Sequence, residues 1–248
     1  MNFFSLFKRN LIYKFKKKIN IDNDDFNNCR LDDLFYYYGS DKSHIFKHTK
    51  DKGHGFSKFY EEHLSEYKNK KVRILEIGSY AGASASAFAK YFPNVEIFCF
   101  DVNISKFIYS SNKIKVFGLD IKNEKKVLHT IKNISNNKSS NFFDIIIDDG
   151  SHNLKDILIG FKILFRYLKS NGIYVIEDYK YPNYFKYNRD VDDILIDQML
   201  LSLKKKKRFS SMILNEKVQL YLINSIKSIQ VYEGNFKSSN IFLIKKKN

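Results

Sequence analysis

The sequence predicts an α/β protein built around a mostly parallel β-sheet. From Val72 onward, short apolar runs rich in β-branched residues alternate with helix-length segments. This alternation is typical of right-handed βαβ units whose sheet is covered by helices on both faces. A glycine-containing segment, Gly78 to Gly82, directly follows the first apolar run and precedes a helix of small residues. The 248 residues suffice for one large domain, which at this size buries roughly 70–75% of the unfolded surface.

The pattern assigns the elements in chain order. Parallel strands are expected near residues 72–77, 95–100, 114–117, 143–148 and 172–177. Helices are expected near residues 57–68, 82–91, 104–110, 123–134, 153–169 and 191–206. After residue 209 the rhythm changes, and two apolar runs at 228–232 and 241–244 predict an antiparallel hairpin at the C-terminus. The hairpin brings the predicted sheet to seven strands.

The N-terminal segment is predicted to be an amphipathic helix. Residues 3–19 place six apolar side chains on one helical face and lysines opposite, the six being Phe3, Phe4, Phe7, Leu11, Phe15 and Ile19. Such a helix can lie on an anionic membrane, or its apolar stripe can pack on the domain or on a partner subunit, which is the interpretation the sequence favours. Residues 21–33 are polar and acidic and resemble a linker. We therefore divide the chain into residues 1–33, helix and linker, and residues 34–248, the main domain.

The composition by itself gives only weak information about binding partners. The net charge of +16 suggests nucleic acid or an anionic membrane. However, most of the positive charge is lysine rather than arginine, the residue favoured for bidentate phosphate and base contacts, so we do not expect a nucleic-acid partner. Cys29 and Cys99 match no metal or CxxC spacing, and no apolar run approaches the 18 residues of a membrane span. A cytoplasmic protein is expected, with peripheral contact at the inner membrane face as the alternative role of residues 3–19.

Two acidic pairs predict a metal-assisted site. Asp148-Asp149 and Glu177-Asp178 each follow an apolar run, and the carboxyl ends of parallel strands meet in the crevice where open α/β sheets bind ligands. Several carboxylate oxygens there suit Mg²⁺ or a similar cation. His152, three residues after Asp149, can accept a proton in the same pocket.

Each of these residues also has a structural alternative. Asp149 or Ser151 can cap the helix that starts at Asn153, and Asp148 is as readily a supporting residue as a ligand. His152 can be a packing residue. A 2-His-1-carboxylate iron site needs a second histidine nearby in the sequence, and none is present there.

The glycine turn predicts an adenosine cofactor with a cationic tail. The turn lets a ligand approach the backbone and the start of the next helix. Glu76, just before it, repels a pyrophosphate but attracts an ammonium group. Asp101 ends the next strand 19 residues beyond Gly82, where a carboxylate holds ribose hydroxyls in Rossmann-like folds. These features together fit S-adenosylmethionine.

With these motifs in place, the chain from about Tyr38 to Lys246 resembles class I methyltransferases, and more narrowly the metal-dependent macrolide-sugar O-methyltransferases of the mycinamicin type. The supporting segments are Tyr38–Lys42, Glu76–Gly82, Ile147–His152, Ile176–Asp178 and Ile226–Tyr232. Ser40 stands where the family usually has threonine, and the segment from Ser43 to Lys52 is longer than is typical.

The resemblance implies that Asp149, Glu177 and Asp178 hold Mg²⁺ and that His152 is the general base. The spacing of Asp149 and Glu177, which are 28 positions apart, also resembles that of catechol-type O-methyltransferases, which have a lysine where His152 stands. The residues predicted to bind the cofactor are Ser40, Lys42, Glu76, Gly78, Ser79, Gly82, Asp101, Asp120 and Asp148.

The predicted protein is thus a Rossmann-like class I methyltransferase, α/β in class, that uses S-adenosylmethionine and Mg²⁺ or a similar divalent cation. Its predicted acceptor is a sugar hydroxyl of a polysaccharide or glycosylated metabolite, and a homo-oligomer is expected. Three alternatives stay open: a catechol-like small-molecule O-methyltransferase, an RNA methyltransferase, and an inactive membrane-attached scaffold. Retention of the four site acids and His152 argues against the scaffold.

Overall fold

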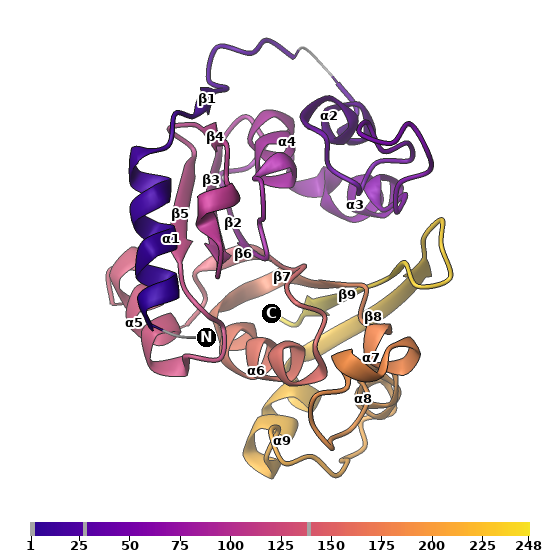
Figure 1. Ribbon diagram of the computed structural model, residues 1–248. Coiled ribbons are helices and arrows are strands. Elements are labelled where there is room, and N and C mark those ends of the chain that lie inside the picture. The colour runs from indigo at the N-terminus through magenta and orange to yellow at the C-terminus, as the bar shows by residue number, and fades with distance from the viewer. Residues whose placement is uncertain (1–2, 27–28, 138–139) are drawn as a thin grey trace. The chain divides into compact units, whose positions relative to one another are not determined.

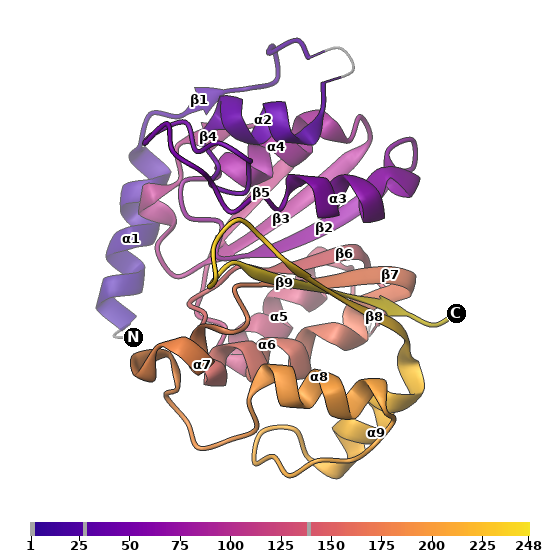
Figure 2. The same cartoon turned by 90° about the vertical axis from the view of Figure 1, so that its right-hand side faces the viewer.

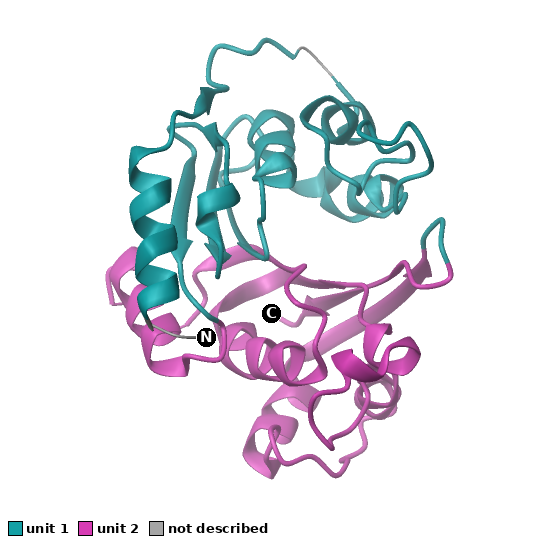
Figure 3. Cartoon of the chain, in the orientation of Figure 1, with its two compact units in different colours: residues 1–120, 234–236 teal, residues 121–233, 237–248 magenta. Residues whose placement is uncertain are grey.

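A computed structural model describes residues 3–26, 29–137 and 140–248 of the chain. The chain divides into two compact units (Figure 3): residues 1–120 with 234–236 form unit 1, and residues 121–233 with 237–248 form unit 2. The ribbon is coloured along the chain in Figure 1 and turned in Figure 2. Each unit is described by itself.

Unit 1 contains three parallel strands that are hydrogen-bonded in the order β5-β3-β2. They span Val72–Ile77 (β2), Val95–Asp101 (β3) and Ile114–Gly118 (β5). β2 and β3 are almost continuously buried, which is why they read as unbroken apolar runs in the sequence. A separate parallel pair joins Ile19–Asn20 (β1) to Tyr109–Ser110 (β4).

The helices of unit 1 share an aromatic core. They span Phe3–Phe15 (α1), Leu31–Tyr38 (α2), Ser57–Leu64 (α3) and Ala83–Tyr91 (α4), with short 3₁₀ turns at Ser65–Tyr67 and Ile104–Lys106. Phe35 of α2, Tyr60 of α3 and Phe88 of α4 are buried, with ring centroids 5.3–6.1 Å apart. This contact joins α2 and α3, which carry the segment around Ser40, to the helix that follows the glycine turn.

Unit 2 contains four strands in the order β6-β7-β9-β8. They span Phe143–Asp148 (β6), Leu168–Glu177 (β7), Ile226–Glu233 (β8) and Asn240–Lys246 (β9). β6 and β7 are parallel, and β9 is antiparallel to both β7 and β8. The strand order of the chain is that of a mostly parallel seven-stranded sheet with an antiparallel C-terminal hairpin, which confirms the predicted fold class.

The helices of unit 2 span Glu124–Ile134 (α5), Leu154–Leu164 (α6), Tyr181–Tyr184 (α7), Ile196–Lys204 (α8) and Glu216–Ser225 (α9), with 3₁₀ turns at Phe165–Tyr167 and Lys186–Asn188. α6 packs on β7 through Phe161, whose ring centroid lies 5.2 Å from that of Tyr174. Lys162 of α6 pairs with Glu124 of α5 at 3.1 Å. These contacts fix the position of α6, and hence the loop that joins it to β6.

The helix predicted at 104–110 is wrong. That segment is a 3₁₀ turn followed by β4, because its backbone bonds elsewhere: the Ile108 amide donates to Ala81 O at 3.1 Å, and the next two residues pair with β1. The Phe107 ring covers Gly82 so closely that a Cβ there would lie 2.4 Å from it. Tertiary pairing therefore overrides the local helical pattern.

The N-terminal helix packs through its polar face. The Arg9 guanidinium donates to Val102 O at 3.1 Å, and the Tyr13 ring lies 6.3 Å from that of Phe107. The apolar stripe faces away: the exposed fractions are 76% for Phe4, 58% for Phe7, 47% for Leu11 and 77% for Phe15; the side chain of Phe3 lies outside the described residues. The stripe therefore does not pack on the rest of unit 1, whereas the expected packing on a partner subunit stays a prediction. Among the described helices, none is long and apolar enough to cross a membrane.

Candidate active site

The predicted cofactor turn in unit 1 depends on left-handed backbone. Gly78 (φ 82°) and Gly82 (φ 83°) both have positive φ, a conformation that glycine adopts without a Cβ clash. The Gly78 amide donates to Phe100 O at 2.9 Å, which ties the turn to the end of β3. The turn thus brings backbone close to the start of α4, as the sequence predicts.

Glu76 is completely buried near the end of β2. The Ser84 hydroxyl, from the first turn of α4, donates to its Oε1 at 2.5 Å. A buried carboxylate is costly unless it is hydrogen-bonded or paired with a cation. This serine therefore orients the carboxylate that we expect to face a cationic cofactor tail.

Asp101, at the end of β3, closes the same turn. Its Oδ2 accepts the Tyr80 amide at 2.8 Å, and its Oδ1 accepts the Asn103 amide at 2.5 Å. Tyr80 itself has positive φ (42°). A carboxylate has about four acceptor positions, so ribose hydroxyls have room on both oxygens. Asp101 consequently shapes the loop as well as being the predicted ribose ligand.

The other predicted cofactor residues of unit 1 lie in different surroundings. Ser40, Lys42 and Ser79 are buried. The Lys42 carbonyl accepts the amides of Phe56 and Ser57 and so fixes the loop between α2 and α3. Asp120 is half-buried just after β5. Cofactor binding by these residues stays a prediction.

Asp101→Ala is expected to weaken S-adenosylmethionine binding by about 1.5–3 kcal/mol, because charge-assisted hydrogen bonds to ribose disappear. Isothermal titration calorimetry measures this directly. Since the substitution also removes two acceptors of backbone amides, Asp101→Asn, which keeps one carbonyl acceptor, and the melting temperature of each variant are the controls. Unchanged affinity in a folded Asp101→Ala protein would contradict the ribose assignment.

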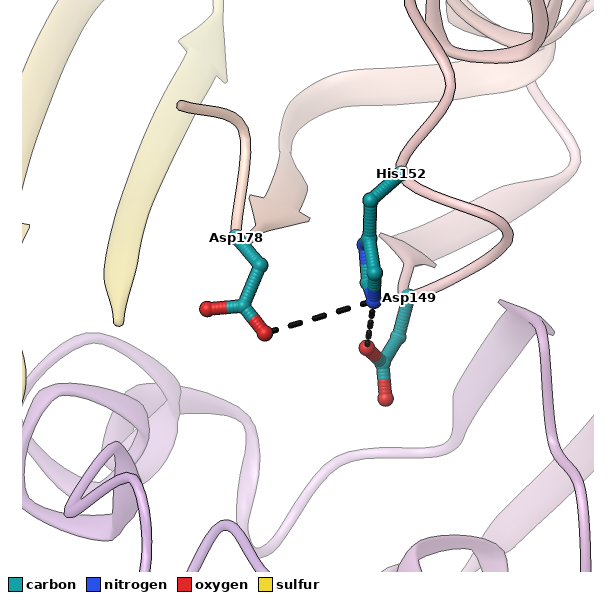
Figure 4. Close-up of side chains that lie close together, drawn as sticks. All are labelled: Asp149, His152 and Asp178. Carbon is teal, nitrogen blue, oxygen red and sulfur yellow. Dashed lines mark ion pairs between the residues drawn. The ribbon is translucent and has the colours of Figure 1, made fainter. Parts of the chain in front are cut away.

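In unit 2, three predicted site residues converge: Asp149, His152 and Asp178 (Figure 4). The His152 Nε2 lies 3.8 Å from Asp149 Oδ1 and 4.0 Å from Asp178 Oδ2. One potential ligand atom from each residue lies within 4.8 Å of the other two. Asp178 is buried, whereas Asp149 and His152 are partly exposed. The two carboxylates supply oxygen donors of the kind that a divalent cation such as Mg²⁺ takes, and the imidazole lies beside them.

Two of these three residues have strained backbone. His152 (φ 55°) and Asp178 (φ 49°) are left-handed without being glycine, at a cost of about 1–3 kcal/mol each. Such strain collects at functional sites and persists only when surrounding contacts fix it. The Tyr181 amide donates to Asp178 O at 2.9 Å and is one such contact.

The loop that carries His152 is fixed by residues that the sequence analysis did not single out. The buried Asn188 side chain donates to Ser151 O at 3.2 Å and to Asn153 Oδ1 at 3.0 Å. The Ser151 hydroxyl donates to Asp156 Oδ2 at 2.6 Å. Nothing in the sequence marks Asn188, because it lies 36 residues beyond His152 in an irregular segment.

The capping alternative is not what the structure contains at this loop. The N-cap of α6 is Asn153, with no side-chain cap hydrogen bond. Ser151 instead accepts the Asn153 amide at 3.3 Å while donating to Asp156. Asp149 therefore lies in the cluster with His152 rather than capping α6.

Asp148 and Glu177 are buried strand-end acids outside the three-residue cluster. Burial raises the pKa of Asp148 to about 8; the Gly150 amide opposes this shift, and the charges of Asp149 and Asp156 add to it. Gly160 of α6 approaches Asp148 so closely that a Cβ there would lie 3.0 Å from Oδ2. The roles predicted for Asp148 at the cofactor and for Glu177 at the metal stay predictions.

Curated relatives match about half of the chain. No family model matches it. Mycinamicin VI 2''-O-methyltransferase of Micromonospora griseorubida is 32% identical over 132 residues, which are 50% of this chain and 31% of the relative. L-olivosyl-oleandolide 3-O-methyltransferase of Streptomyces antibioticus is 30% identical over 132 residues, 50% and 32% of the two chains. The match thus spans about a third of the length of these relatives.

Solved structures with the same fold cover more of the chain. MycE methyltransferase from the mycinamycin biosynthetic pathway, in complex with Mg and SAH, superposes with a TM-score of 0.68 at 22% identity, over 90% of this chain and 56% of that one. Its complex with Mg, SAH and mycinamycin VI gives 0.67 at 22% identity, over 89% and 55%. The protein therefore has the class I methyltransferase fold found in MycE, and half of its sequence resembles the macrolide-sugar O-methyltransferases.

Proposed function

We propose that the protein is an S-adenosylmethionine-dependent O-methyltransferase that uses Mg²⁺ or a similar divalent cation to methylate a sugar hydroxyl of a polysaccharide or glycosylated metabolite. The observation that carries this proposal is the convergence of Asp149, His152 and Asp178. They meet in a chain whose fold and sequence both resemble sugar O-methyltransferases. A bound divalent ion lowers the pKa of a coordinated hydroxyl and fixes its oxygen.

The chain's own residues bind the ion, accept the proton and orient the methyl donor. Asp149 and Asp178 supply the carboxylates that hold the ion, with Glu177 as the further predicted ligand. His152, whose Nε2 faces both carboxylates, accepts the proton that the acceptor hydroxyl releases. Glu76 and Asp101 orient the methyl donor, since alignment of an already activated methyl group is the main requirement of this reaction.

The open alternatives differ in acceptor. A catechol-like enzyme of the same chemistry would methylate a small diol, and an RNA methyltransferase would bind RNA in a salt-dependent manner. The sugar is favoured because the matching relatives are named for sugar positions, and because only 6 of the 43 basic residues are arginine (Arg9, Arg30, Arg73, Arg166, Arg189 and Arg208).

The test is transfer of a tritium-labelled methyl group from S-adenosylmethionine to a parallel panel of nucleotide sugars, polysaccharide, glycosylated macrolide, catechol and RNA. We expect label in a sugar-containing acceptor only. Label in RNA alone or in catechol alone would show that this molecule, rather than a sugar, is the acceptor. The absence of label in every acceptor with Mg²⁺ present would contradict the proposed function.

We further propose a cytoplasmic homo-oligomer whose helix α1 makes peripheral contact with an anionic membrane at its inner face. Residues 1–21 contain six basic side chains and no acidic one, the six being Lys8, Arg9, Lys14, Lys16, Lys17 and Lys18. The stripe of Phe4, Phe7, Leu11 and Phe15 is exposed on this basic helix, the arrangement of helices that lie in a membrane interface. A symmetric contact between two copies of α1 would instead bring like charges together.

Replacing two stripe residues, Phe4→Ser with Phe15→Ser, is expected to lower binding to phosphatidylserine-containing liposomes at least about tenfold, because buried aromatic surface is lost. Sedimentation with liposomes measures this, and methyl transfer should be unchanged. Met212→Ser, at an exposed apolar residue of unit 2, is the matched control. Two results together would show that α1 packs on a partner subunit: the wild-type protein does not bind liposomes, and the double substitution dissociates the oligomer into monomers.

A further inference from the structure

An aromatic row extends outward from His152. The Tyr181 ring lies 4.8 Å from the imidazole, the Phe185 ring 5.2 Å from that of Tyr181, and the Tyr187 ring 5.6 Å from that of Phe185. These three residues are here called the aromatic row: Tyr181 begins α7, Phe185 directly follows α7, and Tyr187 lies in the 3₁₀ turn after it; α7 is labelled in Figure 2. Exposure increases along the row: Tyr181 and Phe185 are half-buried, whereas Tyr187 is 75% exposed.

The row is held rigidly although it lies in an irregular segment. The Phe185 amide donates to Tyr181 O at 2.8 Å, and Asn188, directly after Tyr187, is buried and bonded to the loop that carries His152. Two residues further, Asp190 accepts the Lys155 amide at 3.0 Å. The backbone that carries the rings is therefore tied to the His152 loop before any ligand binds, which reduces the ordering cost of binding.

We propose that the aromatic row is an acceptor subsite on which a second sugar ring, linked to the one being methylated, stacks its apolar face. This inference rests on the proposed function, since it takes the hydroxyl beside His152 as the methylated group. The row is a single file of rings rather than a broad patch, so it suits one extended chain of rings better than a protein surface, which needs far more buried area. Two of its three rings are tyrosines, and aromatic faces with a polar edge suit ligands that are apolar on one side and hydroxylated at the rim.

The subsite predicts selectivity for acceptors with at least two rings. Tyr187→Ala should raise KM for a two-ring acceptor about 2- to 12-fold, the range for one aromatic contact, with kcat and the KM for S-adenosylmethionine unchanged. A one-ring acceptor should not distinguish the variant from the wild type. Tyr187→Phe keeps the ring, so its KM for the two-ring acceptor should equal that of the wild type. A raised KM in Tyr187→Phe would mean that the hydroxyl, rather than the ring, makes the contact.

A direct binding measurement separates this proposal from the methyl-transfer activity. The chain has no tryptophan, so Tyr187→Trp introduces a single fluorescent reporter into the row. Tyr221→Trp is the matched control. Tyr221 is exposed, and its ring centroid lies 6.1 Å from that of Phe165. Phe165 directly follows the C-terminal end of α6, whereas His152 precedes the N-terminal end of that helix. The 11 residues of that helix span about 16 Å. Both variants are titrated with methyl glycosides and with disaccharide glycosides in the presence of S-adenosylhomocysteine and Mg²⁺.

The expected result is a saturable change in the indole emission of Tyr187→Trp with a disaccharide glycoside, and no change in that of Tyr221→Trp. No response of Tyr187→Trp to a two-ring acceptor that the enzyme methylates overturns the subsite and leaves the function intact. A saturable response of Tyr187→Trp without methyl transfer to any acceptor supports the subsite and contradicts the function. An equal response of both variants means nonspecific binding and overturns the subsite.

Discussion

Chelation of divalent ions is expected to abolish methyl transfer, and Mg²⁺ is expected to restore it. The acceptor oxygen would lose both the positive charge that stabilises its deprotonated form and the contact that fixes its position, together several kcal/mol, so turnover should fall by at least about 10³-fold. The measurement is the methyl-transfer rate with EDTA, followed by titration with Mg²⁺. S-adenosylmethionine should still bind the chelated enzyme.

Removing each carboxylate singly should have the same effect as chelation. Asp149→Ala and Asp178→Ala are expected to bind S-adenosylmethionine normally and to lose turnover, as is Glu177→Ala if it is the third oxygen ligand. Asp144→Asn is the matched control, because Asp144 is on the same strand as Asp148 but pairs with Lys169 at 2.8 Å instead of joining the cluster. Full activity of Asp149→Ala in EDTA would rule out metal assistance.

Replacing His152 should separate proton transfer from metal binding. His152→Ala is expected to bind metal and cofactor normally while turnover falls about 10²- to 10⁴-fold, the usual contribution of a positioned general base. Part of the lost rate should return at higher pH as hydroxide replaces the base. The pH dependence of kcat and metal binding by calorimetry are the measurements, and His129→Ala, at a histidine of α5 outside the cluster, is the control.

The backbone at His152 requires a second variant. Because this residue has φ 55°, alanine adds strain to the loss of the imidazole, whereas asparagine tolerates the left-handed conformation. His152→Asn should therefore match His152→Ala in turnover and exceed it in melting temperature. Loss of metal binding in both variants would make His152 a ligand, and would favour a metal that takes nitrogen donors over Mg²⁺. Unchanged turnover and pH profile in both would make it structural.

The sequence determined the sheet, because strands that are buried on both faces appear in the sequence as continuous apolar runs. β2 and β6 begin and end at the predicted residues, since strands buried on both sides need continuous apolar residues. The carboxyl-end acids and the glycine turn follow from the same rule, because strand ends fix where the loops must lie. The helix expected at 104–110 failed because its backbone is used in pairing with a segment about 90 residues earlier, which no local pattern encodes.

Only the tertiary structure decided how the site is supported and which of its acids meet. Glu177 and Asp178 are adjacent in the sequence, yet only Asp178 joins the cluster with His152, because successive side chains at a strand end point to opposite sides and Asp178 adopts a left-handed turn. Asn188 and Tyr181 reach the His152 loop from a segment whose composition gives no signal. The sequence thus determined the strands and the chemistry at their ends through burial and residue type, whereas long-range packing decided which side chains face one another.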